Sequence, residues 1–213
     1  MKIGPAFRRL LPARLERKIA GLYRSIFVDL SCVAHLLAPQ LPHGAKILDV
    51  GGGDGELLNH LFRERPDLHV TMVDVSATVG KFVEPQHRSK IRLLPRTFIE
   101  DHLTEAAGLY DAAVVSDVLH HIPLNSRSGF LANVHKALRS GGRLFIKDIE
   151  PGHFISRLSL FSDKNISGDK GVVLISLREL ASLAERTLPA HTFSETNLLT
   201  ENRPNYLATL QFK

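Results

Sequence analysis

From residue 46 onward the chain alternates between two hydrophobic patterns. Short apolar runs typical of strands buried on both faces alternate with stretches in which apolar residues recur at helical spacing. Strands are predicted at 46–50, 69–75, 91–94, 110–118 and 141–149, and helices at about 54–65, 76–84 and 125–139. This alternation indicates an α/β fold with a parallel sheet covered by helices on both faces.

Different patterns flank this region. After Pro12, apolar residues recur every three or four positions as far as Pro39, with basic residues on the opposite side, which predicts one amphipathic helix. Near the C-terminus, 176–188 is predicted to be a helix, and the two β-rich runs on either side of the turn-forming segment 200–205 predict a closing antiparallel hairpin.

A length of 213 residues favours one domain with a sizeable core. We divide the chain into an N-terminal amphipathic basic helix at 1–40, acting as a lid or surface contact, and a catalytic domain at 41–213. The net charge of +5 lies entirely in residues 1–30, and the remainder carries equal numbers of both signs. This distribution is consistent with a helix that packs on the domain with a solvated basic face, and also allows peripheral contact of residues 1–30 with an anionic membrane. It argues against a nucleic-acid partner.

Cysteine content and hydropathy bear on location. Cys32 is the single cysteine, so the chain cannot form an internal disulfide. No stretch has the length and apolar content of a membrane span or a secretion signal. We therefore expect a cytoplasmic protein.

A glycine-rich turn follows the first predicted strand. Ligands of α/β sheets bind outside the carboxyl ends of the strands, and the segment from Asp49 through Gly51 and Gly53 to Gly55 occupies that position. A dinucleotide site requires a small third residue in GxGxxG, where this chain has Glu56, so a bound pyrophosphate is disfavoured. Asp74 ends the second strand, about 20 residues later, where a carboxylate can accept hydrogen bonds from both ribose hydroxyls. The ligand is predicted to be nucleoside-like.

Four segments together carry a family resemblance. ILDVGGGDGELL, VTMVDVS, YDAAVVSDVLHHIP and LANVHKALRSGGRLFIKDIEP resemble, in order and spacing, motifs of class I S-adenosylmethionine-dependent methyltransferases of the small-molecule type, including those that act on ubiquinone and menaquinone precursors and polyketide-like products. The resemblance implies a Rossmann-like three-layer fold with a seven-stranded, mostly parallel sheet and an antiparallel last strand. It also implies S-adenosylmethionine as the cofactor.

The resemblance further implies cofactor-binding roles for particular residues. Asp49 is expected at the methionine amino group, and Asp74 at the ribose hydroxyls. The segment LLPRTFIEDH departs from the family pattern, although Phe98 could still stack on the adenine ring. The full expected set is Asp49, Gly51, Gly53, Gly55, Asp74, Val75, Thr97, Phe98, Ser116 and Asp117.

Methyl transfer from a sulfonium requires mainly alignment of the acceptor and exclusion of water, and a base helps when the acceptor is a hydroxyl. His120 and His121 follow the strand that carries Asp117, so either could take the acceptor proton; both could instead cap or pack the turn. Asp148 and Glu150 either line the acceptor pocket or are simply solvated. We set aside a metal pair of Asp117 and His121 and expect no metal site.

We therefore predict a methyltransferase acting on a small, apolar acceptor, with oxygen favoured over carbon and nitrogen. Two alternatives stay open: a methyltransferase-like non-catalytic or membrane-associated partner protein, and an RNA methyltransferase that uses the basic N-terminal arm. Against RNA, the turn after the fourth strand lacks an Asn/Asp-Pro-Pro-aromatic signature, and few aromatics accompany the cations.

Overall fold

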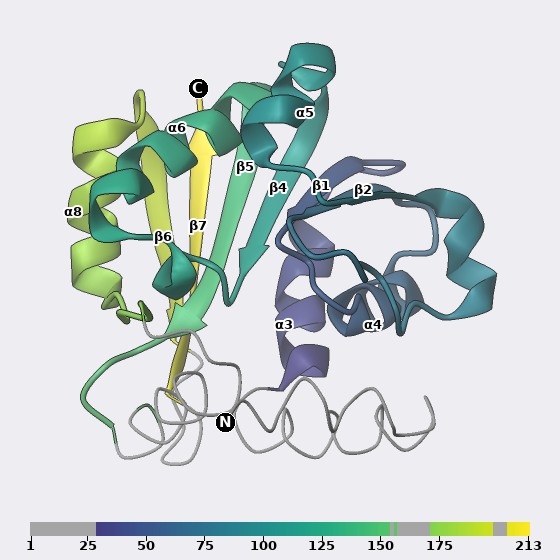
Figure 1. The fold of residues 1–213 in the computed structure, drawn as a ribbon, viewed down its shortest axis with the longest axis horizontal. Coiled ribbons are helices and arrows are strands. Elements are labelled where there is room, and N and C mark those ends of the chain that lie inside the picture. The colour runs from purple at the N-terminus through teal and green to yellow at the C-terminus, as the bar shows by residue number, and fades with distance from the viewer. Residues whose placement is uncertain (1–28, 154–155, 157–170, 198–203) are drawn as a thin grey trace.

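The sheet is built from seven strands in the order β3-β2-β1-β4-β5-β7-β6 (Figure 1). The computed structural model describes residues 29–153, 156, 171–197 and 204–213. The strands are β1 (Lys46–Val50), β2 (His69–Asp74), β3 (Ile91–Pro95), β4 (Tyr110–Ser116), β5 (Leu138–Ile149), β6 (His191–Asn197) and β7 (Asn205–Phe212). The first five pair in parallel, whereas β7 runs antiparallel to both β5 and β6. The predicted fold class and the C-terminal hairpin are confirmed.

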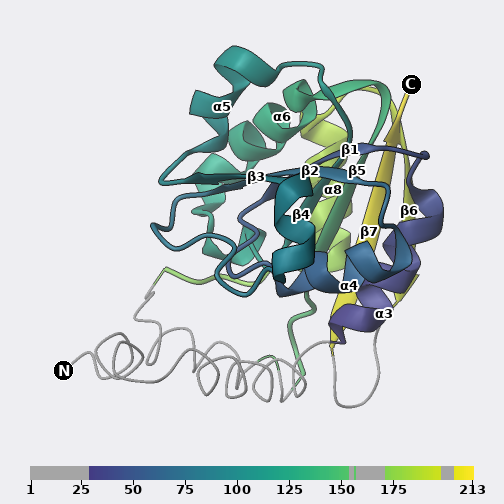
Figure 2. The same cartoon turned by 90° about the vertical axis from the view of Figure 1, so that its right-hand side faces the viewer.

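Helices cover both faces of this sheet (Figure 2). Helices α3 (Leu30–Leu37) and α4 (Glu56–Glu64) pack on one face, and α5 (Ile99–Ala106), α6 (Arg127–Ala137) and α8 (Leu177–Thr187) pack on the other. Short 3₁₀ helices complete the described elements: η1 (Ala38–Gln40), η2 (Pro85–Lys90), η3 (Leu119–His121) and η4 (Leu124–Ser126). The result is a three-layer arrangement with one core on each side of the sheet.

The alternating strand residues supply these two cores. In β1, Ile47 joins the core beneath α3 and α4, while Leu48 joins the core beneath α5, α6 and α8. Both side chains are fully buried, and each contributes roughly 1.5–3 kcal/mol by removal from water. Burial on both faces explains why these strands are nearly continuous in apolar residues.

The strand order reverses between β1 and β4. β1 pairs with β2 on one side and with β4 on the other, so the chain leaves β1 for one half of the sheet and later returns for the other half. At such a reversal the loops beyond the carboxyl ends diverge and leave a crevice. The loops after β1, β2 and β4 therefore surround the natural ligand position.

The predicted helix at 76–84 is wrong. Residues 75–84 form turns and bends, and the 3₁₀ helix η2 begins only at Pro85. The physical reason is that this segment bonds to the glycine-rich turn rather than to itself. The amide of Gly80 donates to the carbonyl of Gly53 at 2.8 Å, and the amide of Phe82 donates to the carbonyl of Asp54 at 2.8 Å.

Helix α5 was not predicted from the sequence. It is short, at eight residues, and no side chain caps its N-terminus at Phe98. Its apolar residues Ile99 and Ala106 face the core. A helix of two turns held by tertiary packing leaves little local signal.

The amphipathic N-terminal helix is also corrected in part. Helix α3 begins at Leu30. The backbone of Asp29 is extended, and its carboxylate caps the helix by accepting from the amide of Cys32 at 3.1 Å, so the predicted helix does not run through residue 29. Residues 1–28, which include most of the predicted basic face, lie outside the described part of the chain. Val33 and Leu37 pack with α4 in the same core, and the division at residue 40 stays a prediction.

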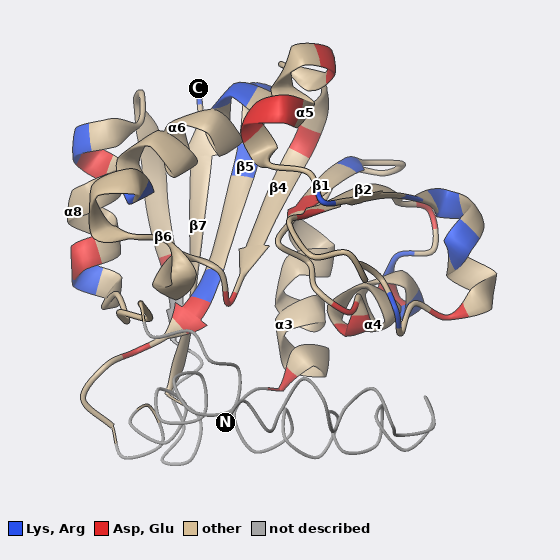
Figure 3. Cartoon of the chain, viewed as in Figure 1, with Lys and Arg blue, Asp and Glu red and all other residues tan. Residues whose placement is uncertain are grey.

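Among the described α-helices, α4 and α8 carry charges of both signs, α5 carries acids, α6 carries cations, and α3 carries neither (Figure 3). Within those residues, no helix has the length and hydropathy needed to cross a membrane.

Candidate functional site

The turn after β1 is built from glycines in the left-handed backbone region. Gly51, Gly53 and Gly55 have φ of 70°, 57° and 84°. A Cβ on Gly51 would lie 2.5 Å from Cγ2 of Val118, and one on Gly55 would lie 2.5 Å from Cγ2 of Val83. A Cβ on Gly53 would meet no atom within 4 Å. The turn is therefore packed closely against its neighbours at two glycines and open at the one between them.

Gly51→Ala is expected to lower the free energy of unfolding by about 2 kcal/mol or more, because it combines left-handed backbone strain with a collision against Val118. Gly129→Ala is the matched control. Gly129 lies within α6, and a Cβ there meets no atom within 4 Å, so this change should stabilise the protein by about 0.5–1 kcal/mol. Denaturant unfolding measures both, and equal effects would contradict the packing described.

Asp74 joins two loops at the carboxyl edge of the sheet. Its Oδ2 accepts from the amide of Gly53 at 2.8 Å, and its Oδ1 accepts from the amide of Ser76 at 2.7 Å. The amide of Gly51 also donates to the carbonyl of Val73 at 2.7 Å. The carboxylate is thus held in place without a ligand, and each oxygen keeps lone pairs that can accept further hydrogen bonds.

Asp49 is a buried acid beneath the glycine turn. It is 2% exposed, and a Cβ on Gly52 would collide with its Oδ2, so the carboxyl group lies directly against the backbone of the turn. Burial raises the pKa of Asp49 to about 7, with the nearby charge of Asp74 adding to the effect. A cation bound beside it would favour the ionised form.

The loops after β2 and β3 carry two exposed apolar side chains. Val75 and Phe98 are each 61% exposed. The loops are tied together, because the amide of Thr97 donates to the carbonyl of Asp74 at 3.0 Å. The hydroxyl of Thr97 donates to the carbonyl of Pro95. Exposed apolar groups beside an anchored carboxylate suit a ligand with a flat apolar part and a hydroxylated part.

The turn after β4 is fixed by β5. Asp117 has an unusual φ of 58° for a residue with a side chain. Its amide donates to the carbonyl of Lys147 at 2.9 Å, and the Lys147 ammonium lies 2.6 Å from its Oδ1. Ser116 donates weakly to the other carboxylate oxygen, at 3.4 Å. Lys147 therefore holds both the backbone and the side chain of Asp117.

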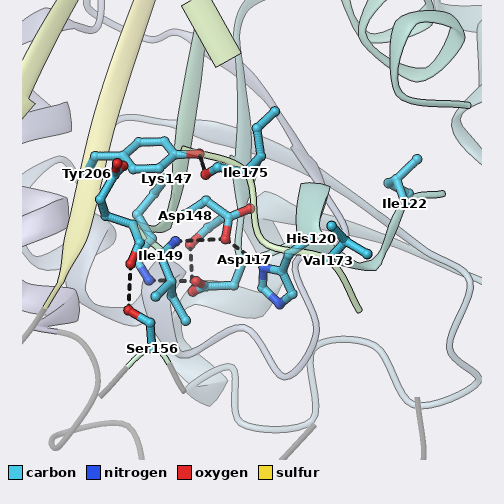
Figure 4. A network of polar contacts seen from close by, with 12 residues as sticks. Asp117, His120, Ile122, Lys147, Asp148, Ile149, Ser156, Val173, Ile175 and Tyr206 are labelled. Carbon is cyan, nitrogen blue, oxygen red and sulfur yellow. Dashed lines mark hydrogen bonds and ion pairs between the residues drawn. The ribbon is translucent and has the colours of Figure 1, made fainter. Parts of the chain in front are cut away.

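His120 forms a buried pair with Asp148 (Figure 4). Its Nδ1 lies 2.6 Å from Oδ1 of Asp148, and the two residues are 3% and 0% exposed. Although burial alone raises the pKa of Asp148, the adjacent His120 and its hydrogen bond hold that pKa below its usual value. An ionised carboxylate only accepts, so Nδ1 carries a proton, and when the ring is neutral its lone pair is on Nε2.

His121 has a different environment. It is exposed, and its ring packs against that of His120 with centroids 4.2 Å apart. Of the two histidines predicted as bases, His120 is the one that pairs with the buried carboxylate of Asp148.

Hydrogen bonds also connect the turn after β4 to the segment before α8. The amide of Val173 donates to the carbonyl of His120 at 3.0 Å. Buried Arg127 donates to the carbonyls of Ile122 and Val173, and Tyr206 donates to the carbonyl of Ile175 at 3.0 Å. These contacts place the segment before α8 against the turn that carries His120.

A group of carboxylate and imidazole ligand atoms within 4.8 Å of one another is formed by Asp117, His120 and Asp148. All three are already engaged: Asp117 pairs with the ammonium of Lys147, and His120 and Asp148 pair with each other. The arrangement is thus a chain of paired charges rather than a ready set of metal ligands. It also differs from the pair of Asp117 and His121 that we set aside.

Two parts of this site were missed or misjudged from the sequence. Lys147 was not selected, although a lysine directly after the apolar run LFI of a predicted buried strand is itself a sign of a paired buried charge. Simple solvation of Asp148 is wrong, because it is fully buried. Glu150 accepts from the amide of Leu177 at 2.9 Å and so helps to start α8.

Comparisons with known proteins agree with the fold. Residues 24–188 match the family model described as a methyltransferase domain. The chain is 30% identical over 65% of its length to the tetracenomycin polyketide synthesis 8-O-methyl transferase TcmO of Streptomyces glaucescens, and 31% identical over 66% to demethylspheroidene O-methyltransferase of Rhodobacter capsulatus. It covers only 43% and 35% of these two relatives.

A solved structure shows the same fold. The S-adenosylmethionine-dependent methyltransferase from Archaeoglobus fulgidus superposes with a TM-score of 0.65 over 90% of this chain and 99% of that one, at 14% identity. The resemblance drawn from the four sequence motifs is confirmed, and with it S-adenosylmethionine as the cofactor.

Proposed function

Because the chain belongs to the methyltransferase domain family, we propose that it moves the methyl group of S-adenosylmethionine to a small, apolar acceptor, most favourably at oxygen. The observation that carries this proposal is the buried His120–Asp148 pair, which lies at the same sheet edge as the glycine turn and Asp74. The names of the two curated relatives, both O-methyltransferases, support oxygen as the nucleophile.

The residues at this edge fit the cofactor. Asp74 would accept from the ribose hydroxyls, and Val75 and Phe98 offer exposed apolar surface for the adenine. Gly53 leaves room for close approach to the backbone, and Asp49 would face the cationic amino group. The backbone amide of Thr97 helps to hold the loop at Asp74 in place. The rest of the binding surface would be formed by Gly51, Gly55, Ser116 and Asp117.

His120 is the proposed base, and His121 a packing residue. Bound S-adenosylmethionine supplies an activated methyl group on a sulfonium. Nδ1–H of His120 donates to Asp148, which orients the ring and would stabilise the imidazolium formed when Nε2 takes the acceptor proton. The protein's other task is to align the acceptor and exclude water, which can supply about 7–11 kcal/mol in favourable cases.

Cofactor binding is expected to depend on pH through Asp49. Its pKa is raised to about 7 in the free protein, and a bound ammonium group would lower it. Below about pH 7, binding must release a proton, so the affinity should fall about tenfold per pH unit as the pH decreases. Asp49→Asn should bind the cofactor more weakly, and its affinity should not change with pH in this range.

Calorimetric titration with S-adenosylhomocysteine from pH 5.5 to 7.5 measures this dependence in both proteins. A flat affinity for the unmodified chain, or an equal slope in Asp49→Asn, would show that Asp49 does not face the amino group.

The proposed reaction is tested by incubating the full chain with methyl-tritiated S-adenosylmethionine and a panel of hydroxylated aromatic compounds. Turnover should yield a labelled product and S-adenosylhomocysteine, and the same compounds with the hydroxyl already methylated are the control. Label transfer to the blocked compounds would place the methyl on carbon or nitrogen. Absence of any S-adenosylhomocysteine binding would favour the non-catalytic alternative.

We further propose a cytoplasmic role in small-molecule biosynthesis, supported by the single cysteine and by the small-molecule names of the relatives. Membrane contact through residues 1–30 stays a prediction. The RNA alternative and the non-catalytic alternative are favoured by no observation on the described residues.

A further inference from the structure

Lys147 is a buried cation that the proposed reaction does not yet use. It lies in β5, is 2% exposed, and directs its ammonium to Asp117 at 2.6 Å. Its neighbour Asp148 points to the opposite face of the strand and pairs with His120. Two consecutive residues of β5 thus bind two residues of the turn after β4 (Figure 4).

The charges around His120 would be unbalanced without Lys147. Asp148 contacts the ring at 2.6 Å, and a carboxylate oxygen of Asp117 lies within 4.8 Å of a ring nitrogen. Two carboxylates this close favour the protonated imidazolium, which cannot accept a proton. The ammonium of Lys147 offsets one of them, because it is bound directly to Asp117.

Other charged or titratable groups pack around this turn. Arg127 of α6 has a favourable interaction with Asp148, and Tyr206 of β7 is buried beside the same carboxylate. The full set in the described residues is Asp117 and His121 on the turn, Lys147, Asp148 and Glu150 on or after β5, Arg127 on α6, Glu179 on α8 and Tyr206 on β7. Lys147 is the member of this set that pairs with Asp117.

We propose that Lys147 is a positioning residue that keeps His120 neutral, and so able to accept a proton, by pairing with Asp117. This inference rests on the proposed function, in which His120 is the base. Lys147 acts through Asp117 and does not itself take part in proton transfer.

The test is an NMR titration of the full chain with isotope-labelled histidine, which reports the protonation midpoint of the His120 ring without requiring an acceptor. In Lys147→Met, which keeps the length of the side chain but removes its charge, the midpoint should rise by about one pH unit, as expected for a unit charge removed at several ångströms. In Asp117→Asn the midpoint should fall. The double variant should return close to the unmodified protein.

Two controls separate charge from packing. Lys136→Met removes an exposed lysine of α6 and should leave the midpoint unchanged. Lys147→Arg keeps the charge and should also leave it nearly unchanged. Asn tolerates the left-handed backbone at position 117, so an unmoved midpoint in Asp117→Asn would overturn the inference even where Lys147→Met fails to fold.

An unmoved or lowered midpoint in Lys147→Met, or an unmoved midpoint in Asp117→Asn, would overturn the inference. Failure of the proposed function looks different: the midpoints shift as stated, but His120→Ala retains full methyl transfer.

Discussion

Asp74→Ala is expected to weaken binding of S-adenosylmethionine about 100-fold. The side chain would accept from two ribose hydroxyls, and each hydrogen bond to a charged group contributes about 1.5–3 kcal/mol. The same carboxylate anchors the amides of Gly53 and Ser76, so its loss also frees the two loops that surround the cofactor. Calorimetry with S-adenosylhomocysteine measures the affinity.

Two further variants locate the effect of Asp74. Asp74→Asn keeps one acceptor oxygen, so its affinity for S-adenosylhomocysteine should fall about tenfold. Asp101→Ala removes an exposed acid in the first turn of α5 and should bind normally. Denaturant unfolding of each variant separates lost stability from lost affinity. Unchanged affinity in Asp74→Ala would remove the cofactor assignment, because that assignment places the ribose hydroxyls on this carboxylate.

His120→Ala is expected to lower the rate of methyl transfer to a hydroxyl acceptor by about 10²–10⁴-fold, the usual contribution of a general base. Binding of S-adenosylhomocysteine should be retained, because the cofactor contacts proposed for the turn after β4 come from Ser116 and Asp117 and not from His120. Single-turnover measurements with the acceptor that turns over best report the chemical step directly.

Asp148→Asn and His121→Ala complete the comparison. Asp148→Asn removes the carboxylate that orients the ring, so the rate should fall nearly as far as in His120→Ala. His121 is exposed and packs on His120, so His121→Ala should change the rate by only a few-fold. A large loss in His121→Ala with little loss in His120→Ala would reverse the two roles.

The parts of the fold that could be predicted were those with strong local patterns. β1 is a short apolar run, and the glycines after it are required by backbone geometry and close packing, so their positions were legible in the sequence. The helix predicted at 76–84 was wrong because the apolar spacing there is helical, while amides of this segment donate to the carbonyls of Gly53 and Asp54 in a different part of the chain. Hydrogen bonds between distant segments leave no periodic signal.

In the site too, residues at strand ends could be predicted from the sequence, whereas contacts between distant residues could not. Asp49 and Asp74 were found because each ends a strand at a predictable place. The partnership of His120 with Asp148 joins residues 28 positions apart, and its significance depends on the register between β4 and β5. A sequence alone cannot distinguish His120 from His121, because one residue's difference along a turn decides which ring is buried.

The most direct test of cofactor binding at the glycine turn and Asp74 is a crystal structure of the full chain with S-adenosylhomocysteine bound. We predict that the ribose hydroxyls lie within hydrogen-bond distance of both carboxylate oxygens of Asp74, that the amino group faces Asp49, and that the adenine lies beside Val75 and Phe98. A ligand bound away from the turn at Gly51–Gly55, or a ribose without contact to Asp74, would contradict it.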